Sequence, residues 1–157
     1  MHCSWNLRNR CNRIRFRSRL SRRVRTATMS KFDAKDILIV DDDPDILAAF
    51  ELAFRHEGAN VRTAVDGVSA LVSIRERAPD LMVLDMMLPR SSGLFVLEKL
   101  QQDGHTFSII MVTANQGKRH RDFALALGAR AYLFKPVSLP RLLELAAGML
   151  VPPPLKS

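Results

Sequence analysis

The 157-residue chain has no cysteine after position 11, because its two cysteines are Cys3 and Cys11. A disulfide within residues 29–157 is therefore impossible, which fits a reducing, cytoplasmic setting. Long apolar runs are missing as well, since no run is longer than six residues, whereas a helix that spans a membrane needs roughly twenty. These absences argue against a disulfide-stabilised secreted domain and against a transmembrane segment.

Acidic residues are absent from residues 1–28, which contain nine Arg and no Lys. The net charge of +8 belongs to this segment, because residues 29–157 carry 15 Lys and Arg against 16 Asp and Glu. Residues 1–34 are expected to form a basic, disordered extension. Three interpretations stay open for it: an arm that binds nucleic acid or lipid, a transit peptide, or sequence that the native protein lacks, with Met29 as the start. Nucleic acid is an expected partner only if the arm is native, and no membrane partner is expected.

From Asp36 onward, short apolar runs alternate with segments of helical period, which predicts an α/β fold with a parallel sheet covered on both faces. The predicted strands are residues 37–40, 61–64, 81–84, 109–112 and 131–134, and the predicted helices are residues 45–56, 67–77, 93–102, 119–127 and 139–150. Gly58, Gly104 and Gly128 stand where helices should end. The chain length suits one domain, expected over residues 35–150. Residues 151–157 are expected to be a short Pro-rich tail without an output domain.

Chemically useful side chains follow four of the predicted strands. They are Asp41 and Asp42 after the first strand, Asp85 after the third, Thr113 after the fourth and Lys135 after the fifth. In an open parallel sheet, ligands bind at the carboxyl ends of the strands. We therefore expect these five side chains to lie at one edge of the sheet.

Taken singly, most of these residues have a structural explanation. Asp42 or Asp43 could cap the first helix, and Lys135 could be a solvated loop charge. Asp85 is different, because it follows the apolar run LMVL on a strand that should be buried, where a carboxylate needs a partner. Clustered carboxylates favour Mg²⁺. A carboxylate can also accept a phosphoryl group when metal and ammonium neutralise the phosphoryl oxygens, with Thr113 as a further donor.

Four segments resemble the successive signatures of response-regulator receiver domains: ILIVDDDPDIL, PDLMVLDMMLPRSSGL, IIMVTA and GARAYLFKP. The resemblance covers about residues 36–150. It implies a doubly wound, flavodoxin-like sheet of five parallel strands in the order 2-1-3-4-5, with a cis peptide at Lys135–Pro136. By position it implies a metal site of Asp41, Asp42, Asp85 and the backbone carbonyl of Met87, the phosphoacceptor Asp85 assisted by Thr113 and Lys135, and the switch residues Thr113 and Tyr132.

The resemblance implies a stand-alone signalling switch of a two-component system or phosphorelay rather than an enzyme. A histidine kinase or phosphotransfer protein would phosphorylate Asp85 with Mg²⁺ as cofactor. Thr113 and Tyr132 would then change the affinity of a target protein for the face formed by the fourth helix, fifth strand and fifth helix. That face includes the basic stretch KRHR at 118–121, which could meet an acidic partner or be a solvated helix start.

Two other functions compete with this interpretation. Residues 41–43 also resemble the D-x-D motif of haloacid-dehalogenase-type phosphatases. However, Asp45 stands where that motif wants Thr or Val, and no acidic pair follows Lys135. A pseudo-receiver that acts only as a scaffold is disfavoured by the intact set of acid, hydroxyl and lysine.

Overall fold

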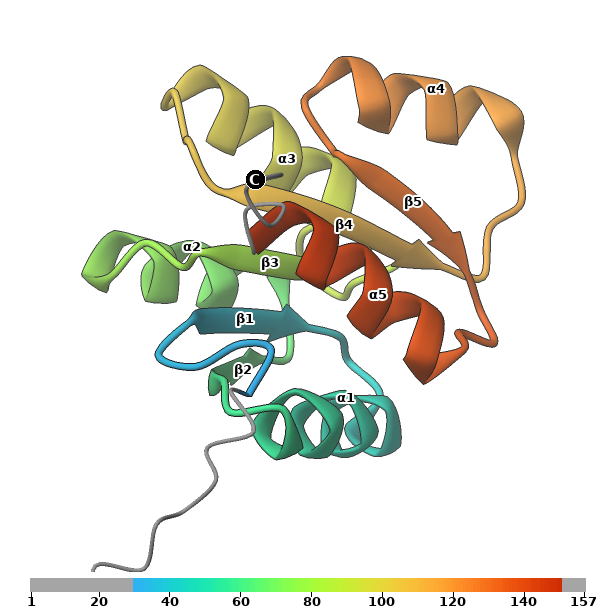
Figure 1. Cartoon of the computed structure of the whole chain (residues 1–157). Coiled ribbons are helices and arrows are strands. Elements are labelled where there is room, and N and C mark those ends of the chain that lie inside the picture. The colour runs from blue at the N-terminus through green and yellow to red at the C-terminus, as the bar shows by residue number, and fades with distance from the viewer. Residues whose placement is uncertain (1–29, 151–157) are drawn as a thin grey trace, which may run out of the picture.

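The computed structural model describes residues 30–150 as five strands that alternate with five helices (Figure 1). The expectations for residues 1–29 and 151–157 lie outside the described residues. The elements are β1 (Asp36–Val40), α1 (Pro44–His56), β2 (Asn60–Ala64), α2 (Gly67–Glu76), β3 (Leu81–Asp85), α3 (Gly93–Gln102), β4 (Ser108–Thr113), α4 (Lys118–Ala126), β5 (Ala131–Phe134) and α5 (Leu139–Leu150). All four strand pairings are parallel and the order is β2-β1-β3-β4-β5, which confirms the predicted fold class and strand order.

Helices cover both faces of the sheet, and the strands supply alternate residues to the two sides. In β1, Ile37 and Ile39 pack in the cluster that contains α1 and α5, whereas Leu38 and Val40 pack in the cluster that contains α2 and α3. Strands β1, β3 and β4 are buried throughout, which explains their continuous apolar runs. Edge strand β2 is buried only at Val61 and Ala64, and its apolar signal in the sequence is correspondingly weak.

The folded unit reaches further toward the amino terminus than the predicted start at residue 35. Phe32 is fully buried, and its ring centroid lies 5.4 Å from that of Phe54 in α1. Its backbone N–H donates to the carbonyl of Glu57 at 3.0 Å. A single aromatic residue outside any periodic pattern carries no secondary-structure signal, so the sequence alone does not place it in the core.

Helix ends agree with the sequence expectations to within one residue. Gly58, Gly104 and Gly128 have φ values of 90°, 68° and 104°, the left-handed conformation that ends helices and that glycine adopts without strain. The Lys135–Pro136 peptide is cis, as the resemblance implied. None of the helices within residues 30–150 is long and apolar enough to cross a membrane.

Candidate functional site

Three carboxylates gather at the carboxyl ends of β1 and β3, which are neighbours in the sheet. One oxygen from each of Asp41, Asp42 and Asp85 lies within 4.8 Å of the others. Asp41 and Asp85 are buried, and Asp42 is exposed. The structure therefore brings together the three acids that were predicted to lie at the carboxyl edge of the sheet. Two members of the group are buried, and the third is exposed to solvent.

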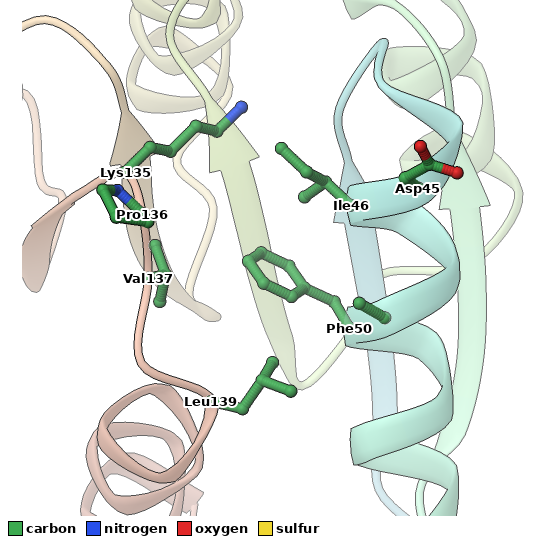
Figure 2. Close-up of a pocket in the computed structure, with 8 residues that line it drawn as sticks. Asp45, Ile46, Phe50, Lys135, Pro136, Val137 and Leu139 are labelled. Carbon is green, nitrogen blue, oxygen red and sulfur yellow. The ribbon is translucent and has the colours of Figure 1, made fainter.

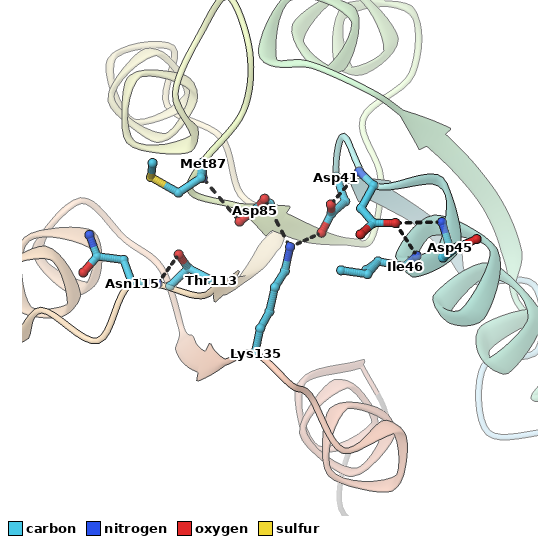
Figure 3. A network of polar contacts seen from close by, with 9 residues as sticks. Asp41, Asp45, Ile46, Asp85, Met87, Thr113, Asn115 and Lys135 are labelled. Carbon is cyan, nitrogen blue, oxygen red and sulfur yellow. Dashed lines mark hydrogen bonds and ion pairs between the residues drawn. The ribbon is translucent and has the colours of Figure 1, made fainter.

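The ammonium group of Lys135 lies between the two buried carboxylates (Figure 3). Its Nζ donates to Asp41 Oδ2 at 2.6 Å and to Asp85 Oδ2 at 3.2 Å. The lysine follows the outermost strand β5, two strands away from β3, so its side chain reaches across the carboxyl end of β4. This contact joins residues 94 positions apart in the sequence.

Burial and charge shift the pKa values of both partners upward. Burial raises the pKa of Asp85, the charge of Lys135 partly offsets this, and the charge of Asp41 raises it again. Burial lowers the pKa of Lys135, but the hydrogen bond that Lys135 donates to Asp41 and the charges of both carboxylates outweigh this effect, and the net shift is upward. One ammonium thus faces three carboxylates. This surplus of oxygen donors and negative charge fits a hard divalent cation such as Mg²⁺.

The structure settles which acid caps α1. Asp43 is the N-cap, and its Oδ1 accepts from the backbone N–H groups of Asp45 at 2.9 Å and of Ile46 at 3.4 Å. The backbone N–H of Asp43 in turn donates to Asp41 Oδ1 at 2.9 Å. Asp43 therefore has a structural role at the start of α1. Asp42, and not Asp43, belongs to the group of three carboxylates.

Thr113 and Tyr132 are connected through one residue, Asn115. The fully buried Thr113 accepts on Oγ1 from the backbone N–H of Asn115 at 3.1 Å. The hydroxyl of the half-buried Tyr132 donates to the carbonyl of Asn115 at 3.3 Å. The side chain of Asn115 accepts from the backbone N–H of Gly117, the N-cap of α4, at 2.8 Å. Sequence reasoning did not find this bridge, because backbone contacts leave no residue-type signal.

The loop after β3 is held close to Asp85 from two sides. The backbone N–H of Met87 donates to Asp85 Oδ1 at 3.3 Å, and a Cβ on Gly93 would lie only 2.1 Å from the carbonyl oxygen of Asp85. Arg90, which has a positive φ, forms an ion pair with the buried Asp66, the N-cap of α2. This ion pair was missed from sequence, because it joins two loops that no local pattern relates.

An apolar cleft of about 350 Å³ opens beside Lys135, between α1 and the segment that follows β5 (Figure 2). Ile46 and Phe50 line it from α1, and Val137 and Leu139 line it from the opposite side. Lys135 also contributes to the lining. An apolar surface therefore adjoins the same lysine that contacts Asp85.

Comparisons with known proteins agree on one family. The family described as response regulator receiver domain matches residues 37–147. A probable transcriptional regulatory protein TcrX of Mycobacterium tuberculosis is 40% identical over 103 residues, which are 66% of this chain and 44% of that protein. The alkaline phosphatase synthesis transcriptional regulatory protein PhoP of Bacillus subtilis is 39% identical over 104 residues, which are 66% of this chain and 43% of that protein. The chain thus spans less than half the length of these relatives.

Solved structures support the same conclusion. A CheY-like response regulator receiver domain protein from Methanospirillum hungatei JF-1 has a TM-score of 0.72 and 35% sequence identity. The match covers 75% of this chain and 94% of that one.

Proposed function

Because the chain belongs to the response-regulator receiver family, we propose that it is a phosphorylation-dependent signalling switch with Asp85 as the phosphoacceptor. The observation that carries the proposal is the setting of Asp85. It is a buried carboxylate, 3.2 Å from an ammonium group and beside two further carboxylates. A purely structural carboxylate needs one partner, whereas this set holds more negative charge than Lys135 neutralises.

The proposed reaction transfers a phosphoryl group from a histidine of a kinase or phosphotransfer protein to Asp85. A carboxylate oxygen of Asp85 attacks phosphorus, a P–O bond forms and the P–N bond to the donor imidazole breaks, after which that nitrogen takes up a proton. The ammonium of Lys135 neutralises charge on the phosphoryl oxygens. The Thr113 hydroxyl donates to another of these oxygens. Asp85 needs no general base, because an ionised carboxylate is already the nucleophile.

Asp41, Asp42 and Asp85 are the residues that would hold Mg²⁺, together with the backbone carbonyl of Met87. When bound, the ion would supply the positive charge that a phosphoryl group at this site requires. Receiver domains typically bind Mg²⁺ at such an acidic group, and the three carboxylates here have suitable oxygen donors at suitable separations.

The donor protein is proposed to approach over the apolar cleft between α1 and the segment after β5. This surface places a docked side chain next to Lys135, which contacts Asp85. The downstream partner is proposed to bind the α4–β5–α5 face, and Thr113 and Tyr132 would relay the state of Asp85 through Asn115. A cytoplasmic location is part of the same proposal.

The test is Mg²⁺-dependent labelling of the purified chain by acetyl phosphate, read as one added phosphoryl group by intact-mass measurement. We expect Asp85→Asn to abolish labelling. Asp103→Asn, on an exposed residue at the end of α3, is the matched control and should label like the unmodified chain. Labelling that survives Asp85→Asn but is lost in Asp41→Asn would instead support the phosphatase interpretation.

A further inference from the structure

Positive charge is concentrated at one edge of the domain. Residues 114–134 contain four Lys or Arg and one Asp, whereas the rest of residues 30–150 contains ten Lys or Arg and 15 Asp or Glu. All five charged residues of this segment are exposed. Four of them lie in α4, and Arg130 lies in the loop between α4 and β5. Figure 1 shows that α4 and β5 lie together at the end of the sheet. The domain therefore has a positive edge on an otherwise negative surface.

The stability of α4 does not account for these cations. The N-cap of this helix, Gly117, offers no side-chain hydrogen bond, and the first turn contains no acid. Cations there face the positive end of the helix dipole, which is unfavourable. Among residues 30–150, Lys118 and Arg119 form no ion pair, and the Nε of Arg121 lies 3.6 Å from the carboxylate of Asp122. The cations are thus available to a partner rather than used within the described domain.

Exposed apolar side chains accompany the cations. Lys118, Arg121 and Leu125 fall on one face of α4, because residues three and four apart are neighbours on a helix. Leu125 is 42% exposed, and Phe134 of β5 is 40% exposed. Only Ala124 is buried in the whole of α4, so this helix is covered less than the other four. Exposed cationic and apolar groups on the same two neighbouring elements favour an amphipathic acidic partner.

This edge is also connected to the phosphoacceptor site. The ring of Phe134 lies edge-on to that of Tyr132, with centroids 5.4 Å apart. The hydroxyl of Tyr132 donates a hydrogen bond to the carbonyl of Asn115, and the backbone N–H of Asn115 donates one to Oγ1 of Thr113. A change at the hydroxyl of Thr113 can therefore reach the exposed ring of Phe134 through two residues, Asn115 and Tyr132.

We propose that a basic edge docks an acidic, amphipathic segment of a partner protein; its residues are Lys118, Arg119, Arg121, Leu125 and Phe134. The inference deepens the proposed function, on which its regulation by phosphorylation rests. The acidic groups of the segment pair with the cations of α4, and its apolar groups cover Leu125 and Phe134.

The test measures binding of the whole chain to a synthetic helical peptide that has Glu on one face and Leu on the other. The reference peptide has Gln in place of every Glu. We expect the Glu peptide to bind about tenfold more tightly and its binding to weaken as salt is added. The double variant Lys118→Glu/Arg121→Glu should lose about tenfold in affinity.

Matched controls separate this surface from general charge effects. The double variant Arg75→Glu/Lys99→Glu has the same charge change on exposed residues of α2 and α3 and should bind as the unmodified chain does. Phe134→Ala should weaken binding. Phe95→Ala, at a residue of α3 that is 44% exposed, should not.

Equal binding of the Glu and Gln peptides would overturn the inference, as would equal losses in the two double variants. Tighter binding of a DNA duplex at the same edge would also overturn it in favour of a nucleic-acid partner. If Asp85 is labelled by acetyl phosphate but the Glu peptide binds neither form, the inference fails and the proposed function stands. If the peptide binds as expected and Asp85 is not labelled, the basic edge stands and the proposed function fails.

Discussion

Removing the Lys135 ammonium should destabilise the domain and make its stability depend on Mg²⁺. In Lys135→Met, Asp41 and Asp85 keep their buried positions, 2% and 3% exposed, but lose the group that lies 2.6 Å and 3.2 Å from their oxygens. Breaking a buried ion pair by removing one partner costs about 3–5 kcal/mol. The lysine side chain is 19% exposed and Asp42 leaves the group open to solvent, so we expect about 3 kcal/mol, at the lower end of that range.

The pH dependence of the variant follows from the direction of the Asp85 shift. The folded-state pKa of Asp85 lies above its usual value, chiefly because of burial, so its ionisation disfavours the folded state. Stability is highest below the unfolded-state pKa and is lost as pH rises through the raised pKa. Removing Lys135 removes the charge that offsets this rise. The Lys135 pKa is itself raised, so its contribution is complete at neutral pH and disappears only in strongly alkaline solution.

The assay is urea-induced unfolding with chelator and with Mg²⁺, at neutral pH and at about pH 5. With chelator at neutral pH, the free energy of unfolding of Lys135→Met should be about 3 kcal/mol below that of the unmodified chain. Acid or Mg²⁺ should recover more stability in the variant than in the unmodified chain. Lys99→Met, on an exposed lysine of α3, should change stability by less than about 0.5 kcal/mol. If Lys135→Met and Lys99→Met lose the same free energy of unfolding with chelator, repulsion between the buried carboxylates does not destabilise the domain.

Three further substitutions test the loops around the site and the limits of the fold. Asp43→Ala removes the α1 cap and should lower the free energy of unfolding by about 1 kcal/mol while phosphoryl labelling by acetyl phosphate persists; loss of labelling without loss of stability would give Asp43 a chemical role. Phe32→Ala should cost about 3–5 kcal/mol in urea unfolding, and a cost below about 0.5 kcal/mol would restore the boundary at residue 35. Gly93→Ala should cost at least about 2 kcal/mol and slow labelling, because its Cβ would lie 2.1 Å from the Asp85 carbonyl oxygen; an unchanged protein would show that the loop yields freely.

The alternating apolar runs were sufficient to predict the fold class and the acids at the strand ends, whereas the strand order was implied by the resemblance to receiver domains. A buried parallel strand is a continuous apolar run, and the residue that follows it lies at the carboxyl edge. Asp85 after LMVL is the clearest instance: once β1 and β3 are neighbours in the sheet, Asp41 and Asp85 must be close. The prediction needed no side-chain geometry.

Other features could not be predicted, because they depend on which atoms meet. Asp42 and Asp43 are the same residue type at adjacent positions, and only the path of the loop makes the second the cap of α1. The Asp66–Arg90 ion pair joins two loops. Asn115 connects Thr113 to Tyr132 through backbone atoms, which every residue type possesses.

The charge of the site ties its stability to its proposed chemistry. The ammonium of Lys135 contacts both buried carboxylates, but its charge does not cancel the effect of burial, which raises the pKa of Asp85. A phosphoryl group on Asp85 would add roughly one further negative charge where Lys135 is the nearest cation described. The phosphorylated form should therefore gain more stability from Mg²⁺ than the unmodified form does, by mass action on a more negative site. Comparing the Mg²⁺-induced gain in unfolding free energy before and after labelling with acetyl phosphate measures this difference. Equal gains would mean that the metal and the phosphoryl group do not share the carboxylates of this site.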